Sequence, residues 1–298
     1  MIVTPLVAST FCSDGGAMFG LVPKPLWSKL IPANERNGIR QNANCLLVEL
    51  ADGRRGLVDT GCGPAEGFTE KELAIHDLSP GWPLLEALSR LGLTEQEIDF
   101  VVLTHLHWDH AGGTRHGAEG EAQRLTFTKA DHFVHKVEWE AATSGDPLLY
   151  HSYPPSVIEP LRTIEGTRLH LVTDETTEVL PGILLARTGG HTRGHSAVVI
   201  EAEDLTLNHP DAARFPGARR LVFAADVCPP QHHLRMVFQS AYDTSPLDTR
   251  AWKREHLTRI AEAGDLLLFD HDPDAFGATL RPDPRKEFVV EQILPVTA

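Results

Sequence analysis

Short runs of aliphatic residues alternate with polar turns along the chain and predict both strands and helices. Asn44–Leu50 and Arg55–Gly61 are two such runs separated by ADGR, which predicts two strands joined by a hairpin. Leucines then recur at helical spacing in GWPLLEALSRLGL, which predicts an amphipathic helix. Thr94 and Glu97 have the spacing of a capping box, so a short helical turn is expected next.

The same alternation continues to the end of the chain. FVVLTH predicts a buried strand, FVH a second strand, and Lys136–Thr143 a helix. LHLV, ILLART, AVVIEA and RRLVFAAD predict four more strands, followed by a helix over Leu247–Ala263 and the strand DLLLFDH. The strands form two groups with their own helices, which predicts two sheets packed face to face with helices outside. Because no repeat or Gly/Ser linker divides the 298 residues, we expect one domain over residues 1–298.

Three histidines and an aspartate crowd the end of the strand predicted by FVVLTH. If the chain stays extended there, alternation sends His105, His107 and Asp109 to one side, and His110 joins them where the chain turns into AGG. Nitrogen and oxygen donors at this density suit a borderline metal such as zinc. Four donors so close together can also be shared between two neighbouring ions.

Three polar residues elsewhere offer further ligands. His191 lies in ARTGGHTRGHS, Asp226 ends LVFAAD, and His271 follows LLLFD, so each interrupts or ends an apolar run. A polar side chain in such a place is costly unless it is paired or coordinated. Taken singly, Asp226 or His271 would serve equally well as a helix cap or turn residue. Together with the histidine cluster they complete a ligand set for two metals.

Composition narrows the classes of partner. Acidic residues exceed basic ones by 41 to 27, giving a net charge of −14, so neither nucleic acid nor an anionic membrane surface is an expected partner. The four cysteines are scattered without CxxC spacing, which indicates neither a disulfide framework nor a thiolate zinc site. The amino-terminal stretch lacks the basic and apolar regions of a secretion signal, so we expect a cytoplasmic protein.

Five motifs in this order, LVDTG, HLHWDH, GGHTRGH, FAAD and FDHD, resemble the metallo-β-lactamase superfamily over residues 44–272. The resemblance implies an α+β fold, a four-layer αββα sandwich with metals at one edge of its two sheets. It implies that one metal is held by His105, His107 and His191, and the other by Asp109, His110 and His271, with Asp226 bridging. It also implies that Asp59 orients a ligand and that His195 is structural.

DGGAMFGLVPKPLWSK, TGGHTRGHS and SAYD look further like the branch that includes probable quorum-quenching N-acyl-homoserine-lactone lactonases. This likeness implies a hydrolase in which a hydroxide bridging two divalent metals opens a lactone or ester, with Asp109 passing a proton to the leaving alkoxide. Zinc is the expected metal, with manganese, cobalt and iron as alternatives. His107 stands where the di-iron redox members have glutamate, which favours hydrolysis over electron transfer.

The chain departs from these lactonases in the residue that assists the oxyanion. They commonly have a tyrosine shortly after the bridging aspartate, but here Val227, Cys228 and Pro229 follow Asp226. Tyr242 of SAYD is the replacement we expect, with His232 and His233 as alternatives.

Other parts of the chain and other activities remain open at this stage. We expect residues 1–40 to form an amino-terminal strand followed by a lid or interface segment, whose apolar residues line an acyl-chain wall, pack in the core or contact a second copy in a homodimer. A phosphotriesterase or arylesterase would use the same two-metal site. A non-catalytic metal-binding protein is the alternative from a different class.

Overall fold

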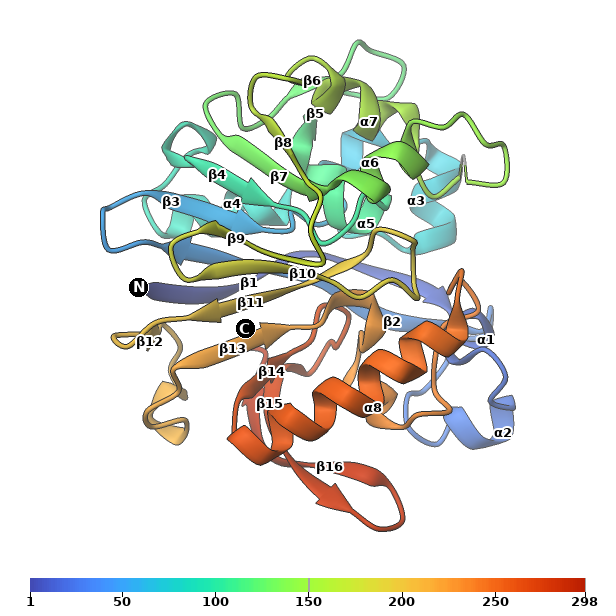
Figure 1. Cartoon of the computed structure of the whole chain (residues 1–298). Helices are drawn as coiled ribbons and strands as arrows, with labels where there is room; N and C mark the ends of the chain where they lie inside the picture. The colour runs from blue at the N-terminus through green and yellow to red at the C-terminus, as the bar shows by residue number, and fades with distance from the viewer. Residues whose placement is uncertain (150, 298) are drawn as a thin grey trace.

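The computed structural model describes residues 1–149 and 151–297, and its strands form two large mixed sheets (Figure 1). The first sheet contains, in spatial order, β12 (Thr206–Leu207), β1 (Ile2–Asp14), β2 (Gly38–Glu49), β3 (Arg55–Val58), β4 (Phe100–Val102), β7 (Asp131–His135) and β8 (Leu169–Val172). The second contains β16 (Glu287–Pro295), β15 (Ala275–Asp283), β14 (Leu266–Leu268), β13 (Arg220–Phe223), β11 (Ser196–Glu201), β10 (Ile183–Arg187) and β9 (Thr176–Leu180). A small separate hairpin pairs β5 (Arg115–His116) with β6 (Arg124–Leu125).

Helices lie on the outer faces of the two sheets. Those that follow strands of the first sheet are α3 (Glu70–His76), α4 (Pro83–Arg90), α5 (Trp108–Ala111), α6 (Lys136–Ala142) and α7 (Pro155–Arg162). The long α8 (Pro246–Ala263) packs on the second sheet, and α1 (Gly15–Phe19) and α2 (Lys24–Trp27) follow β1 (Figure 1). Single 3₁₀ turns are η1 (Ala65–Gly67), η2 (Glu95–Glu97), η3 (Gly112–Thr114), η4 (Ala212–Arg214), η5 (Ala225–Val227) and η6 (Gln231–Leu234).

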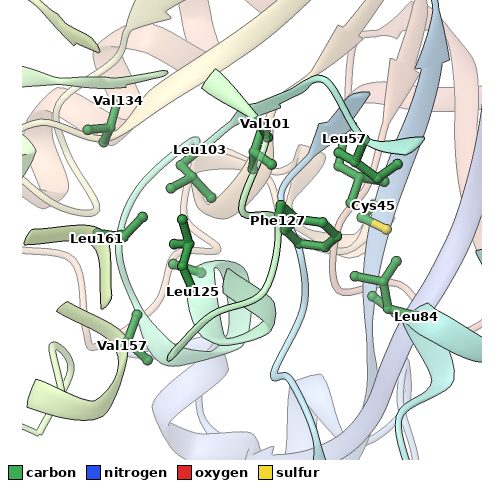
Figure 2. Close-up of a cluster of buried hydrophobic side chains, with 14 of the residues drawn as sticks. Cys45, Leu57, Leu84, Val101, Leu103, Leu125, Phe127, Val134, Val157 and Leu161 are labelled. Atoms are coloured by element: carbon green, nitrogen blue, oxygen red, sulfur yellow. The ribbon is translucent and has the colours of Figure 1, made fainter. Parts of the chain in front are cut away.

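Alternate side chains of the buried strands enter different core layers. On β4, Phe100 and Val102 belong to the cluster between the sheets, where they join Val198 and Phe223 of the second sheet. Val101 points the other way, into the layer between the first sheet and its helices (Figure 2). Both faces of β4 are therefore buried, which is why its sequence is a continuous apolar run.

The outer layers complete the sandwich. In Figure 2, Leu84 of α4 and Val157 and Leu161 of α7 surround Phe127 and Val101 on the helical side of the first sheet. On the far side of the molecule, Trp252 and Leu257 of α8 pack against the outer face of the second sheet. Four layers follow one another, helix, sheet, sheet and helix, so the predicted αββα sandwich is confirmed.

Most of the predicted elements form within a few residues of their expected bounds. The hairpin at ADGR joins β2 to β3 in antiparallel pairing, α4 covers the leucine repeat, and Thr94 and Glu97 make both hydrogen bonds of a capping box at η2. The sequence reading missed α7, which begins with a proline in a turn-rich stretch, and the hairpin of β15 and β16. In both segments, proline or charged residues interrupt the apolar pattern from which helices and strands were predicted.

The amino-terminal segment divides into a strand and a small separate core. Residues 2–14 form the long strand β1, which pairs along its whole length with β2. Beyond it, Phe19 stacks on Trp27 with ring centroids 5.4 Å apart, and Ile39 and Phe238 close the same cluster. Leu21 and Leu26 remain exposed. The segment thus has a core of its own, and its predicted role as a lid or interface stays a prediction.

Candidate metal centre

The histidine motif leaves the first sheet as a loop and enters a short helix. β4 ends at Val102, His107 is the N-cap of α5, and Asp109 and His110 lie on that helix. Asp59 fixes the loop in place, because its carboxylate accepts hydrogen bonds from the Thr104 amide (2.8 Å) and hydroxyl (2.7 Å). The motif is therefore held at the carboxyl end of a buried parallel strand, at the edge of the sheet.

One group of donor atoms comes from both sheets and defines a first metal position. His105, His107, His191 and Asp226 each place a nitrogen or oxygen within 4.8 Å of the others. His191 Nε2 lies 2.8 Å from Asp226 Oδ2 and 3.1 Å from His107 Nδ1. His105 Nε2 lies 3.8 Å from the same Asp226 oxygen. This position has three imidazoles and one carboxylate oxygen.

A second group lies on the other side of Asp226. It consists of His110, Asp226, Asp270 and His271, again within 4.8 Å of one another. The Nε2 atoms of His110 and His271 are 3.2 Å apart, and they lie 3.6 Å and 3.1 Å from Asp226 Oδ1. Each carboxylate oxygen of Asp226 thus faces a different histidine group, which is the arrangement of a bridging ligand.

The donor groups fit a pair of cations. Two nitrogens bound to one zinc ion at roughly 2.0–2.1 Å in tetrahedral geometry lie about 3.3 Å apart, which matches the 3.1 and 3.2 Å separations observed here. His105 Nε2 and Asp226 Oδ1 are buried and have no hydrogen-bond partner among the described residues. Lone pairs that converge in this way repel one another and lack solvent, so a bound cation would satisfy them.

The predicted ligands all lie in this region, although they are not equally close. Six of the seven belong to the two groups: His105, His107, His110, His191, Asp226 and His271. The seventh, Asp109, lies beside the second group, with Oδ2 3.5 Å from His271 Nε2. Their role as ligands stays our prediction.

Asp270 is the residue that the sequence reading missed. It stands next to His271 in FDHD, and its side chain belongs to the second donor group. The signal was present, because Asp270 directly follows the apolar run LLLF, just as Asp226 follows LVFAA. Only His271 of that motif entered the predicted set.

The outward nitrogens of the histidines are held by partners around the site. His110 Nδ1 lies 2.9 Å from Asp59 Oδ2, and His191 Nδ1 lies 3.0 Å from Asp243 Oδ1. His271 Nδ1 lies 2.8 Å from a main-chain oxygen of β2, that of Asn42. These acceptors favour a proton on Nδ1 and leave Nε2 free to bind a metal. Asp59 therefore lies where its predicted orienting role requires.

Charge and burial act in opposite directions on the pKa of His191 and Asp226, and in the same direction on the pKa of His105 and His107. Burial lowers the pKa of His191, but the carboxylates of Asp226 and Asp243 outweigh it and raise the pKa to about 10. Burial and the neighbouring histidines lower the pKa of His105 and of His107. Burial raises the pKa of Asp226, but His191 and His271 outweigh this and hold it well below its usual range. The Asp226 carboxylate is therefore ionised, and a cation bound at His191 Nε2 would replace a proton.

Replacing Asp243 with alanine is expected to weaken metal binding about 10- to 100-fold, because His191 loses the group that orients its ring. Titration of chelator-treated protein with zinc measures this change. Asp248→Ala is the control, since Asp248 is exposed at the start of α8 and its carboxylate accepts a hydrogen bond from the Ser245 hydroxyl. Equal zinc affinity in the two variants would contradict the orienting role.

Two non-glycine residues adopt left-handed backbone angles next to the site. Asp59 has φ 56° and Ala225 has φ 48°. Each such residue costs about 1–3 kcal/mol and persists only where the surroundings fix it. Here the amide of Asp226 donates to His195 Nε2 at 3.1 Å, which holds the strained turn at η5. His195 uses its inward nitrogen for this bond, in agreement with the structural role expected for it.

A buried glutamate joins the two loops that form the first metal position. The Glu138 carboxylate accepts hydrogen bonds from the Leu106 amide (3.0 Å), the Tyr153 hydroxyl (2.8 Å) and the Thr192 hydroxyl. Leu106 lies between His105 and His107, and Thr192 follows His191. Glu138 on α6 therefore fixes the spacing of the loops from the two sheets.

Two of the three candidate oxyanion residues, Tyr242 and His233, lie in different places. Tyr242 is 49% exposed, and burial followed by the negative charges of Asp109, Asp14 and Asp226 raises its pKa to about 12. His233 is buried in the amino-terminal cluster, where its Nε2 lies 2.8 Å from the Met18 oxygen. The charges of Asp109 and Asp226 therefore act on the Tyr242 hydroxyl, whereas His233 is engaged in the amino-terminal cluster.

The fold and the two-position site together define a class of protein. Residues 38–207 match the family model described as the metallo-beta-lactamase superfamily, and the chain belongs to that superfamily. No helix among the described residues is long and apolar enough to cross a membrane.

Named relatives and solved structures support the same class. An N-acyl homoserine lactonase from a Bacillus species is 29% identical over 167 residues, 53% of this chain and 58% of the relative. A probable metallo-hydrolase of Mycobacterium tuberculosis is 29% identical over 175 residues, 55% of this chain and 54% of the relative. These alignments span only a little over half of each curated relative. A probable metal-dependent hydrolase from Staphylococcus aureus aligns over 98% of this chain and 97% of its own, with 27% identity and a TM-score of 0.81.

A dizinc quorum-quenching lactonase solved with its product N-hexanoyl-L-homoserine shares the fold. Its TM-score is 0.70 at 18% identity, over 97% of this chain and 93% of its own.

Proposed function

We propose that the protein is a two-metal hydrolase that opens a lactone or an ester, most specifically an N-acyl-homoserine-lactone-type lactonase. The observation that carries this proposal is the placement of Asp226, with one oxygen facing each of two histidine groups. The lactonases among the relatives support the substrate class.

The chemistry follows from what surrounds the two positions. Two ions held there would supply Lewis acidity and activate water at neutral pH, with zinc as the proposed metal and manganese, cobalt or iron as alternatives. Asp109 lies beside the second position with its side chain 16% exposed, and we assign it the transfer of a proton to the departing alkoxide oxygen. No serine or cysteine nucleophile is needed.

Beside the second position lie one buried aromatic ring, Phe11, and two half-buried rings, Trp108 and Phe68, which offer an apolar surface to the substrate. Phe11 contacts His271 edge to face, with ring centroids 5.3 Å apart, and also lies 5.5 Å from Trp108. Phe68 extends the surface from Trp108 at 5.8 Å. An acyl chain placed there would leave water without moving the carbonyl away from the metals.

Tyr242→Phe is expected to lower kcat on a good lactone by about 10²-fold, because the substitution removes only the hydroxyl that we assign to the developing oxyanion. The Tyr242 ring stays in place, so KM should change little. Steady-state kinetics with wild type and variant at equal metal content make the comparison. Full kcat in the variant would remove Tyr242 from the catalytic residues.

A comparison of three substrates tests the function. Purified protein of known metal content is assayed with an acyl-homoserine lactone, a simple aryl ester and paraoxon. Lactone turnover far above the other two supports the proposal, whereas paraoxon leading would favour a phosphotriesterase. Stoichiometric metal with no turnover on any of the three would favour a non-catalytic metal-binding protein. The cytoplasmic location and the homodimer expected for this chain stay predictions.

A further inference from the structure

We propose that Asp270 is an additional ligand of the second metal position and that it makes the two positions select different metals. This inference rests on the two-metal part of the proposed function. It adds a residue that the predicted ligand set does not contain and assigns it a consequence for metal identity.

The position of the Asp270 side chain carries the first step. Its Oδ2 lies 3.7 Å from His110 Nε2 and 3.6 Å from His271 Nε2. The residue is 1% exposed, and neither carboxylate oxygen has a hydrogen-bond partner among the described residues. A buried carboxylate without partners is strongly destabilising, so its natural partner is a cation at the point where these donors converge.

The main chain fixes Asp270 in this orientation. The Asn44 amide on β2 donates to the Asp270 main-chain oxygen at 2.7 Å. The Asn44 side chain donates to the main-chain oxygens of Phe269 and Asp272, each at 3.0 Å. Asn44 therefore ties the loop after β14 to the first sheet on both sides of His271. The Asp270 side chain is held towards the site by contacts that do not involve its carboxylate.

Asp272 shows what a structural carboxylate looks like in the same loop. Its Oδ1 accepts hydrogen bonds from the amides of Asp274 and Ala275, both at 2.9 Å, and its Oδ2 accepts one from the Gln231 amide at 3.0 Å. It is as buried as its neighbour, at 2% exposure. The two aspartates that flank His271 therefore differ: Asp272 accepts three hydrogen bonds from main-chain amides, whereas the Asp270 carboxylate accepts none from the described main chain and faces His110, His271 and Asp226.

With Asp270 included, the two positions differ in the type of donor. The first has three imidazoles, from His105, His107 and His191, and one oxygen of Asp226. The second has two imidazoles, from His110 and His271, and oxygens from two carboxylates, Asp226 and Asp270, with the carboxylate of Asp109 beside it. Imidazole suits zinc, whereas carboxylate oxygen suits harder ions such as manganese. The second position should therefore accept manganese or iron in competition with zinc more readily than the first.

The test compares Asp270→Asn with Asp272→Asn by metal content. Each chelator-treated protein is loaded from an equimolar mixture of zinc and manganese and desalted. Its zinc and manganese contents are then measured by elemental mass spectrometry. Wild type should hold two ions, with manganese enriched at one of the two positions. Asp270→Asn should keep the first ion and bind the second at least about 10-fold more weakly, with the manganese share lost. Asp272→Asn should keep two ions with the wild-type ratio.

Thermal unfolding of the metal-free proteins separates a ligand from a structural residue. If Asp270 is a ligand, the metal-free Asp270→Asn protein should unfold at the wild-type temperature or higher, because a buried carboxyl group without a hydrogen-bond partner among the described residues has been replaced by a neutral amide. Metal-free Asp272→Asn should unfold at a lower temperature, since asparagine offers only one acceptor oxygen in place of the two that now bond three amides. Asp270→Ser gives a second variant that also removes the charge.

The outcomes distinguish this inference from the proposed function. Two ions with the wild-type zinc-to-manganese ratio in Asp270→Asn and Asp270→Ser would overturn the inference. A metal-free Asp270→Asn protein as unstable as Asp272→Asn, with an unchanged gain on metal addition, would also overturn it. Both readouts are independent of turnover, so failure of the lactone assay would leave the assignment of Asp270 standing.

Discussion

Asp226→Asn should lose metal from at least one position and lose more activity than any change outside the ligand set. The asparagine amide nitrogen cannot bind a cation, so only one of the two positions keeps an oxygen from residue 226. Changes in the residues that surround metal ligands lower metal affinity or activity about 10- to 100-fold. Loss of the bridge should exceed that upper value in kcat on a lactone, which corresponds to more than about 2.7 kcal/mol of transition-state stabilisation.

Metal analysis and kinetics on the same preparation measure both effects of Asp226→Asn. Glu203→Gln is a suitable control, because Glu203 is an exposed carboxylate on a surface turn of the second sheet. It should retain two ions and wild-type kcat. An Asp226→Asn protein that kept two ions and a kcat within tenfold of wild type would show that Asp226 does not bridge.

Removal of the metals should destabilise the whole protein as well as abolish turnover. Ligands from both sheets converge on the ions, and without them His105 Nε2 and Asp226 Oδ1 remain buried without partners. For each site, free metal at 100 times its dissociation constant adds about 2.7 kcal/mol of apparent stability. For a chain of this size that corresponds to several degrees in Tm for each ion.

Thermal scans with and without a chelator give the size of this effect, and activity followed during metal addition shows whether it is reversible. Tm and turnover should rise together as zinc or manganese is returned to the chelated protein. A chelated protein with unchanged Tm and undiminished lactone turnover would be incompatible with a two-metal mechanism.

The sequence predicted those parts of the site where a polar residue ends an apolar run. His191, Asp226 and His271 were predictable in this way, because burial at a strand end is costly without a partner. The expected extended alternation of the histidine motif is only partly correct. The chain turns into α5 at Trp108, so Asp109 lies on a helix beside the second group and not in line with His105 and His107.

Long-range contacts explain what the sequence did not predict. Asp270 and His271 are neighbours whose side chains would face opposite ways on an extended chain, but the hydrogen bonds of Asn44 hold the loop so that both enter the second group. Glu138 was equally hidden, since α6 is far in sequence from the loops it joins. The layers of the fold could be predicted from the sequence, because buried strands such as β4 and β13 are continuous apolar runs.

The metal centre receives its histidine motif from one sheet and His191, Asp226 and His271 from the other. A pair of ions held by residues of both sheets would cross-link the sheets. The sheets could then separate only after the ions dissociate. Unfolding of the loaded protein would then be slow, and its lifetime against proteases would depend on the supply of metal. A shortage of metal would thus lower the amount of folded protein through proteolysis, in addition to abolishing its activity.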